Sequence, residues 1–259
     1  MIKNKVVPIA VVSAFIMLLS GLIPSISKAQ FEGSIIYQRS DVDTKTKQEK
    51  VIGEMELILT PDRMLLKGLD NIARMKLIGS EPTSMIVVRQ DKKDFLMMDG
   101  QSKALKVSKK DLQTMSSFLS NFNSGNNNNG DQISIRSTDE TATLNGYSIR
   151  KSVLWNKEKP LTQVNVWFTD ELNVDWGILS ESWLSESSSM FVPSFIFEHF
   201  FKKNSIPLLI QQFENDTLVS EMKATRIDEV EISAERTAVP DGLNIMGLQE
   251  YMMLKMSGN

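Results

Sequence analysis

A two-residue alternation of apolar and polar side chains recurs along most of the chain and limits the folds open to it. From Phe31, one side of the pattern carries Phe31, Ile35 and Tyr37, while Glu32 and Ser34 lie on the other. This period is typical of a half-buried β-strand. It predicts further strands at Val51–Leu59, Arg63–Leu69, Ser84–Arg89, Asp94–Asp99, Lys103–Val107, Gln132–Ser137, Tyr147–Trp155, Val164–Phe168, Pro207–Phe213, Leu218–Ile227 and Val230–Ile232. Strands this numerous, separated by hairpin-length turns, indicate an antiparallel sheet that curls or closes.

Two apolar helices are predicted within this series of strands. Ser108 can cap the first, with Asp111 three residues later and apolar residues at helical spacing over Leu112–Phe122. The second is expected over Met190–Lys202 and is apolar on nearly every side, so protein, lipid or a bound molecule must cover it. The Asn-, Ser- and Gly-rich run Asn121–Asp131 is predicted to be a mobile loop without a ligand.

The first 29 residues have the pattern of a signal peptide. Lys3 and Lys5 precede an apolar stretch over Val6–Ile23, and a small-residue cleavage pattern ends at Ala29. We expect cleavage after Ala29, with an uncleaved membrane anchor as the alternative. Residues 30–259 then form a single domain in the periplasm or outside the cell.

Composition narrows the classes of partner. The chain contains no cysteine, which excludes disulfides, thiolate metal sites and a lipid-modified cysteine. Loss of the three lysines of the signal peptide leaves 26 basic against 32 acidic residues, a net charge of −6. Nucleic acid is therefore not expected as a partner, and neither is electrostatic adhesion to anionic lipid head groups.

The residue patterns of common enzymes are missing from the sequence. His199 is the one histidine and lies among phenylalanines, as a packed side chain would. No nucleophile elbow, phosphate-binding glycine loop or zinc-binding helix motif occurs. Glu54 and Glu56 share a strand face, a spacing that a glycosidase could use, but the solvated side of a half-buried strand explains them more simply. We expect a non-enzymatic protein with no catalytic residue, cofactor or metal.

Short motifs along the mature chain resemble a known family. They are Leu144-Asn-Gly-Tyr-Ser-Ile-Arg-Lys151, Val166-Trp-Phe-Thr-Asp-Glu-Leu172, Ile206-Pro-Leu-Leu209 and Val239-Pro-Asp-Gly242. With a Phe-Glu-Gly strand directly after the signal, their order resembles the DUF4412 family of exported Bacteroidota proteins, which is similar to the LolA/LolB periplasmic lipoprotein carriers. The chain departs from those carriers in its Asn-rich loop and in having no arginine that matches their functional one.

The resemblance implies a fold and a function. The fold is α+β and mainly antiparallel β, a strongly bent open half-barrel sheet wrapped around a few helices. The function it implies is binding of a lipid or a lipoprotein acyl chain in an apolar groove. The alternative is a structural or interaction module of the cell envelope with a filled core. The residues expected to line the groove are Met190, Phe191, Phe195, Phe197, Phe200, Met97 and Trp167.

Overall fold

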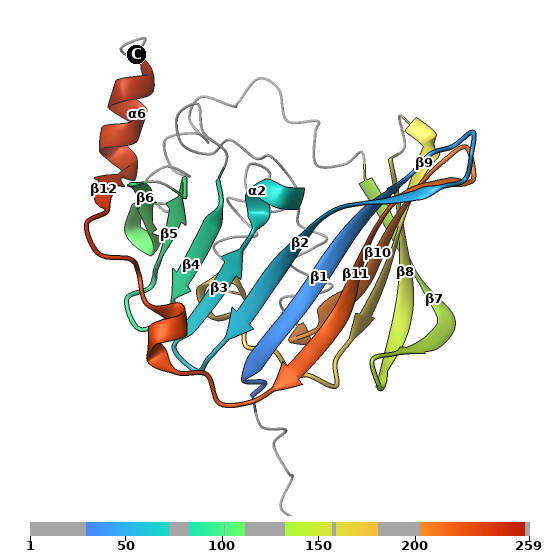
Figure 1. Cartoon of the computed structure of the whole chain (residues 1–259), viewed down its shortest axis with the longest axis horizontal. Helices are drawn as coiled ribbons and strands as arrows, with labels where there is room; N and C mark the ends of the chain where they lie inside the picture. The colour runs from blue at the N-terminus through green and yellow to red at the C-terminus, as the bar shows by residue number, and fades with distance from the viewer. Residues whose placement is uncertain are drawn as a thin grey trace, which may run out of the picture.

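The computed structural model describes residues 30–72, 83–100, 102–111, 133–156, 159–180 and 203–256. Within these ranges the chain forms one twelve-stranded sheet with short helical segments (Figure 1). The strands are β1 (Gly33–Val42), β2 (Glu49–Leu59), β3 (Arg63–Lys67), β4 (Met85–Arg89), β5 (Asp94–Met98), β6 (Lys103–Ser108), β7 (Ile133–Leu144), β8 (Tyr147–Asn156), β9 (Lys159–Thr169), β10 (Ile206–Glu214), β11 (Thr217–Glu229) and β12 (Asn244–Gly247). The helical segments are α2 (Leu69–Ile72), η1 (Gly177–Ser180), η3 (Ala234–Thr237) and α6 (Leu248–Met256).

The strand order in the sheet is β12-β6-β5-β4-β3-β2-β1-β11-β10-β9-β8-β7. Strands β1 to β6 form one run of consecutive antiparallel neighbours, and β7 to β11 form another. The antiparallel pair β1–β11 joins the two runs. Only the β12–β6 pair is parallel among the described strands. The predicted antiparallel sheet is therefore confirmed.

Two tight hairpins follow from their turn residues. Asn145 and Gly146, between β7 and β8, have φ angles of 51° and 86°. Asn215 and Asp216, between β10 and β11, have φ angles of 49° and 59°. Two-residue turns with both φ angles positive match the twist of the flanking strands, and Asn, Asp and Gly adopt them most readily.

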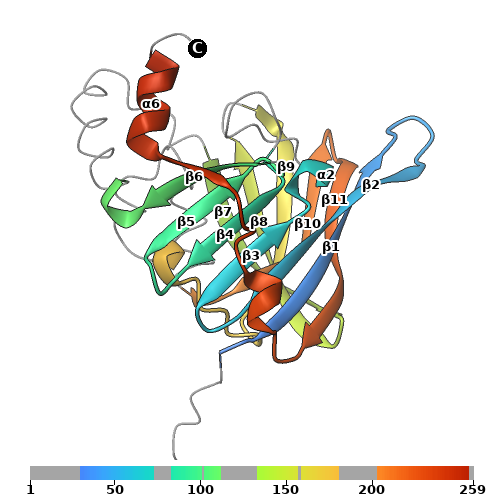
Figure 2. The same cartoon turned by 60° about the vertical axis from the view of Figure 1, so that its left-hand side comes forward.

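The sheet is open and curled (Figures 1 and 2). We call its largest hydrophobic cluster, which joins strands from both halves of the sheet, the inner cluster. This inner cluster takes side chains from β1 to β4 and also from β8, β10 and β11, which lie beyond the middle of the sheet. The segment 172–178, which follows β9 and runs into η1, adds four buried side chains to it. Its buried members are Phe31, Ile35, Tyr37, Met55, Leu57, Leu59, Met64, Leu69, Val88, Ile149, Leu172, Val174, Trp176, Ile178, Ile206, Leu208 and Ala224.

Three long-range hydrogen bonds join strands that are not neighbours. The Tyr37 hydroxyl on β1 donates to the carbonyl oxygen of Pro207 on β10 over 2.8 Å. The Asn145 amide, at the β7–β8 turn, donates to the carbonyl oxygen of Ala224 on β11 over 2.8 Å. The Tyr147 hydroxyl donates to a carboxylate oxygen of Glu229, also on β11. Because other strands lie between each pair, these bonds bridge the curl and hold its curvature.

The opposite face of β2 to β6 carries an outer cluster of Ile58, Leu65, Val87, Leu96, Met98, Ala104 and Ile232. The segment 230–243 crosses this face, visible in Figure 1 as the orange chain in front of β3. Two arginines anchor it. Arg236 donates to Glu56 over 2.6 Å, and Arg63 donates to the carbonyl oxygen of Thr237 over 2.9 Å. The outer face of this half of the sheet is therefore partly covered by the segment 230–243.

The C-terminal end departs from the sequence prediction. The strand predicted at Val230–Ile232 is wrong, because Ile232 packs into the outer cluster and its backbone N–H donates to Glu32 instead of to a neighbouring strand. Strand β12 and helix α6 were not predicted. The strand predicted to reach Leu69 ends at Lys67, since Gly68 has a φ of 82° and the chain turns into α2.

The start of the first predicted helix is confirmed. The backbone N–H of Asp111 donates to the Ser108 hydroxyl over 3.1 Å, and the Asp111 carboxylate accepts from the backbone N–H of Ser108 over 2.9 Å. This reciprocal pair is a capping box. The predicted segments Leu112–Phe122, Asn121–Asp131 and Met190–Lys202 lie outside the described residues, as does the predicted signal peptide.

Candidate functional site

Two rows of apolar side chains cross the inner face of β1 to β6. Each member of a row lies directly opposite the next in the antiparallel pairing. The first row consists of Ile35, Leu57, Leu66, Ile86, Met97 and Leu105. The second row consists of Leu59, Met64, Val88, Phe95 and Val107. Because side chains alternate between faces of a sheet, the two rows form one apolar surface.

Burial along this surface is uneven. Ile35 and Val88 are at most 1% exposed. Leu66, Ile86 and Phe95, in the middle of the surface, are only half-buried. Ile86 and Phe95 pack against the inner cluster on one side and against a separate cluster under α6 on the other. We call these three half-buried side chains the apolar strip.

Helix α6 covers the far end of the same surface. Its Leu248 is 8% exposed and joins Met97, Leu105 and Val107 in one cluster, to which Tyr251 and Met252 add from the helix. The helix follows directly on β12, which pairs along the edge of β6. The C-terminal segment thus passes from the outer face, round the β6 edge, to the inner face.

A separate apolar row lies on the second half of the sheet. Register places Val166 of β9 beside Ser152 of β8 and beside Ile210 of β10, and Ile210 beside Met222 of β11. Met222 packs against the inner cluster, so this row adjoins it. The buried side chains Leu154, Val166 and Phe168 form a cluster here, with Ile135, Val164 and Ile210 half-buried around it. We call this the β8–β9 cluster.

Ser152 is the polar exception among these apolar side chains. It is 0% exposed, and its Oγ has no hydrogen-bond partner. No other buried side-chain nitrogen or oxygen in the described ranges lacks one. Ser205, also 0% exposed, illustrates the usual case, since its hydroxyl donates to the carbonyl oxygen of Lys203 over 3.5 Å.

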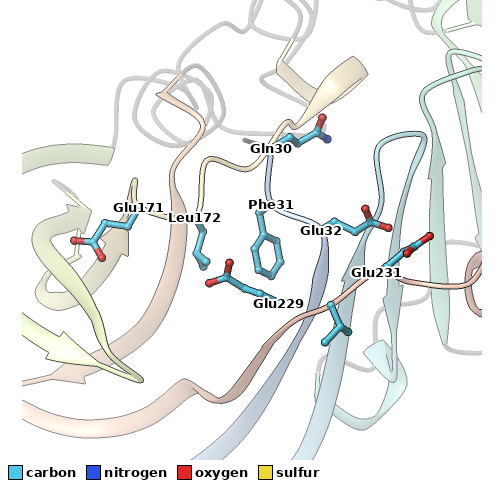
Figure 3. Close-up of a pocket in the computed structure, with 8 residues that line it drawn as sticks. Gln30, Phe31, Glu32, Glu171, Leu172, Glu229 and Glu231 are labelled. Atoms are coloured by element: carbon cyan, nitrogen blue, oxygen red, sulfur yellow. The ribbon is translucent and has the colours of Figure 1, made fainter. Parts of the chain in front are cut away.

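A separate open pocket of about 390 Å³ lies where the chain enters β1 and leaves β11 (Figure 3). It is lined by Gln30, Phe31, Glu32, Glu171, Leu172, Glu229, Val230 and Glu231. Figure 3 shows the Phe31 ring beside Leu172 and Glu229.

Several of the glutamates in this pocket have partners in the protein. Glu32 accepts from the backbone N–H of Ile232 over 3.1 Å, and Glu171 accepts from that of Ser148 over 3.3 Å. Glu229 accepts from the Tyr147 hydroxyl. Burial, together with this hydrogen bond and the negative charges of Glu229 and Glu171, raises the pKa of Tyr147 to about 12. Among the residues that the structure describes, no group of three or more His, Cys, Asp or Glu side chains is placed to hold a metal ion.

The structure places two of the predicted groove residues. Met97 is 9% exposed and lies in the first inner row, in contact with the α6 cluster. Trp167 is half-buried beside the inner cluster, where its Nε1 donates to Gln211 over 3.3 Å and Lys151 lies 5.7 Å from its ring centre. The two side chains belong to different clusters. The other five predicted residues, Met190, Phe191, Phe195, Phe197 and Phe200, lie outside the described ranges, as does His199.

The two carboxylates noted on β2 are held by neighbours. Glu54 accepts from the Gln38 amide over 3.3 Å, and Glu56 pairs with Arg236.

The apolar strip and Ser152 were missed in the sequence. Alternation marks Leu66, Ile86 and Phe95 as inward-facing, but it gives no measure of how fully each is covered. The burial of Ser152 depends on Val166 and its neighbours across the sheet, which only the pairing register reveals.

Comparison with models of known protein families and with curated protein sequences finds no match. Among solved structures, PNGF-II is similar with a TM-score of 0.46 and 17% identity, over 88% of this chain and 34% of PNGF-II. This chain thus spans about a third of the PNGF-II chain. MucB has a TM-score of 0.34 and 9% identity, over 89% of this chain and 64% of MucB. The MucA/MucB complex of Pseudomonas aeruginosa has a TM-score of 0.30 and 9% identity, over 83% of this chain and 57% of the matched chain.

All three TM-scores lie below 0.5, so the description of the fold rests on the strand pairing itself. None of the described helices combines the length and apolar character that a membrane crossing requires.

Proposed function

We propose that this chain is an exported, non-enzymatic protein of the DUF4412 and LolA-like type, and that it binds a hydrophobic ligand on the inner face of its curled sheet. The expected ligand is a lipid or the acyl chain of a lipoprotein, met in the periplasm or outside the cell. The observation that carries the proposal is the apolar strip of Leu66, Ile86 and Phe95. Half-buried apolar side chains at the centre of an otherwise buried surface are what a ligand would cover.

The size of the surface fits a chain-like ligand. It crosses β1 to β6 in two rows, so a flexible hydrocarbon can follow it across several strands. Burial of apolar area contributes about 25 cal/mol per Å², or about 0.8 kcal/mol per methylene group. An acyl chain of ordinary length therefore supplies enough free energy for binding without a charged contact.

The sharpest test is lipid content. The protein purified from cells is examined by native mass spectrometry and then by lipid extraction, and a fluorescent fatty-acid probe is titrated into the delipidated protein. We expect co-purified lipid and saturable uptake of the probe. Reproducible absence of both would rule the proposal out.

A second function is favoured by how thoroughly the rest of the inner face is filled. Ile35, Val88, Ile206 and Leu208 are each at most 1% exposed. A structural or interaction module of the cell envelope would show such complete burial, because its core is filled by its own side chains and needs no ligand. In that case truncation of Phe95 would lower stability and change no binding property, whereas a carrier would lose probe affinity.

A further inference from the structure

Helix α6 exposes apolar side chains beyond those that it packs on the sheet. Leu248, Tyr251 and Met252 belong to the α6 cluster. Met253 and Leu254, the next two residues, are 61% and 41% exposed. At about 100° of rotation per residue, they point away from the packed side of the helix. Figures 1 and 2 both show α6 projecting from the sheet, so these two side chains lie on the outer half of a protrusion.

Lysines gather at the strand ends beside α6. Lys93 lies two residues before Phe95, and Lys109 lies two residues after Val107. Both Phe95 and Val107 belong to the α6 cluster. The backbone N–H of Lys109 donates to the carbonyl oxygen of Lys93 over 3.0 Å, so the two segments lie side by side. Because a strand rises about 3.3 Å per residue, the backbones of these lysines lie within about 7 Å of the cluster.

The charge of these segments is locally positive. We call their four lysines the basic patch: Lys92, Lys93, Lys109 and Lys110. Three of the four are exposed. The same segments hold two aspartates, Asp91 and Asp111, and the Asp111 carboxylate accepts from Ser108 in the capping box. The predicted mature chain is negative overall, but salt screens charges beyond about 8 Å, so the local balance governs attraction to a surface.

We propose that the outer half of α6 and the basic patch dock on the surface of an anionic lipid bilayer. Met253 and Leu254 enter the boundary of the acyl chains, and the lysines meet the phosphates of the head groups. Apolar insertion and basic residues are two signals that together hold a peripheral protein on such a surface. Glu250, exposed on the same side of α6 but one turn nearer the sheet, stays in water. The inference goes beyond the proposed function, since docking needs no ligand inside the curl.

Vesicle flotation tests the docking. Vesicles of phosphatidylcholine and phosphatidylglycerol in equal parts are compared with vesicles of phosphatidylcholine alone. The wild type should bind the mixed vesicles, and less so at high salt. Met253→Glu should weaken this binding at least about tenfold, because a charge replaces an inserted apolar side chain. Leu161→Glu is the matched control and should leave binding unchanged, since Leu161 is 66% exposed on β9 in the other half of the sheet.

The contribution of the basic patch is measured separately. The double variant Lys92→Gln with Lys93→Gln should weaken binding to the mixed vesicles about fivefold for each lysine removed. Its binding to phosphatidylcholine alone should equal that of the wild type. All the altered side chains are exposed, so the melting temperatures of the variants should match that of the wild type.

The absence of cysteine from the chain gives a direct second readout. Met253→Cys and Leu161→Cys can each carry one polarity-sensitive fluorophore. Emission from the label at position 253 should shift to shorter wavelength when mixed vesicles are added. Emission from the label at position 161 should not change.

Each outcome supports or overturns the inference. Binding of the wild type to neither kind of vesicle would overturn it, and so would equal binding by the wild type, Met253→Glu and the double lysine variant. A shift of the label at position 253 that follows protein concentration without vesicles would assign α6 to contact with a second copy instead. Vesicle docking without uptake of a fatty-acid probe would leave the inference standing while the proposed function fails, and probe uptake without docking would do the reverse.

Discussion

Arg89 and Asp94, on either side of the turn between β4 and β5, form a two-point ion pair with both nitrogen–oxygen distances at 2.6 Å. The two side chains are 11% and 2% exposed, and Lys106 lies 3.7 Å from the same carboxylate. Register places Arg89 directly opposite Asp94. The pair thus closes the β4–β5 hairpin beside its turn.

Arg89→Ala should destabilise the protein by about 3 kcal/mol, because it leaves a buried carboxylate with only the more distant Lys106. Urea denaturation followed by circular dichroism measures the change. The double variant Arg89→Met with Asp94→Leu should recover most of the loss, since no uncompensated charge stays buried. A double variant as unstable as Arg89→Ala would contradict this account.

Leu248→Ala should lower stability by about 2 kcal/mol, because Leu248 is the α6 side chain buried against Met97, Leu105 and Val107. Met253→Ala on the same helix is the matched control. Met253 is 61% exposed, so the expected change is within about 0.5 kcal/mol. Thermal denaturation of both variants measures the difference, and equal effects would mean that α6 does not pack as described.

Ile86→Gln should reduce affinity for a fatty-acid probe about tenfold, because it places an amide in the apolar strip that the ligand is expected to cover. Ile52→Gln serves as control, since Ile52 is 39% exposed near the start of β2 and outside the inner rows. Fluorescence titration gives both affinities. Unchanged binding by Ile86→Gln would place the ligand elsewhere.

Stability should fall as the pH rises from about 10 to about 12. The pKa of Tyr147 is raised to about 12, chiefly by burial, and burial also raises the pKa of Tyr37. In this range the folded state holds protons that the unfolded state has released, so the free energy of unfolding decreases with pH. Below pH 10 both states hold these protons and the contribution is constant.

Urea denaturation at a series of alkaline pH values measures this dependence. Tyr147→Phe should show a shallower decline than the wild type, because one of the two tyrosines no longer titrates. A decline of unchanged slope would assign the effect to other groups.

Much of the sheet could be predicted because alternation reports directly on which face each residue occupies. The pattern located β1, β2, β4, β5 and β6 to within a few residues. It failed at β12, where Asn244–Gly247 is too short to show a period. It failed also at α6, whose apolar residues include Met253 and Leu254 on the exposed side as well as Leu248 on the packed side.

The order of the strands in the sheet could not be predicted from the sequence, for a physical reason. Hairpin signals such as Asn145-Gly146 specify which strands are consecutive neighbours, but β1 meets β11 and β6 meets β12 through contacts between distant residues. The candidate site depends on those contacts. Ser152 reads as an ordinary strand serine until Val166 and Ile210 are known to lie beside it.

The pairing of β1 with β11 sets the order in which the molecule can fold. Glu32, just before β1, meets Ile232, just past β11, across a separation of 200 positions. Each run of consecutive strands can form its hairpins early, but the seam between them must wait until almost the whole chain is available. Loop closure over such distances makes folding slow, on the order of milliseconds to seconds or longer. Until β1 and β11 pair, the two edges that form the seam are open to other chains, so aggregation or a chaperone would compete with folding at this step.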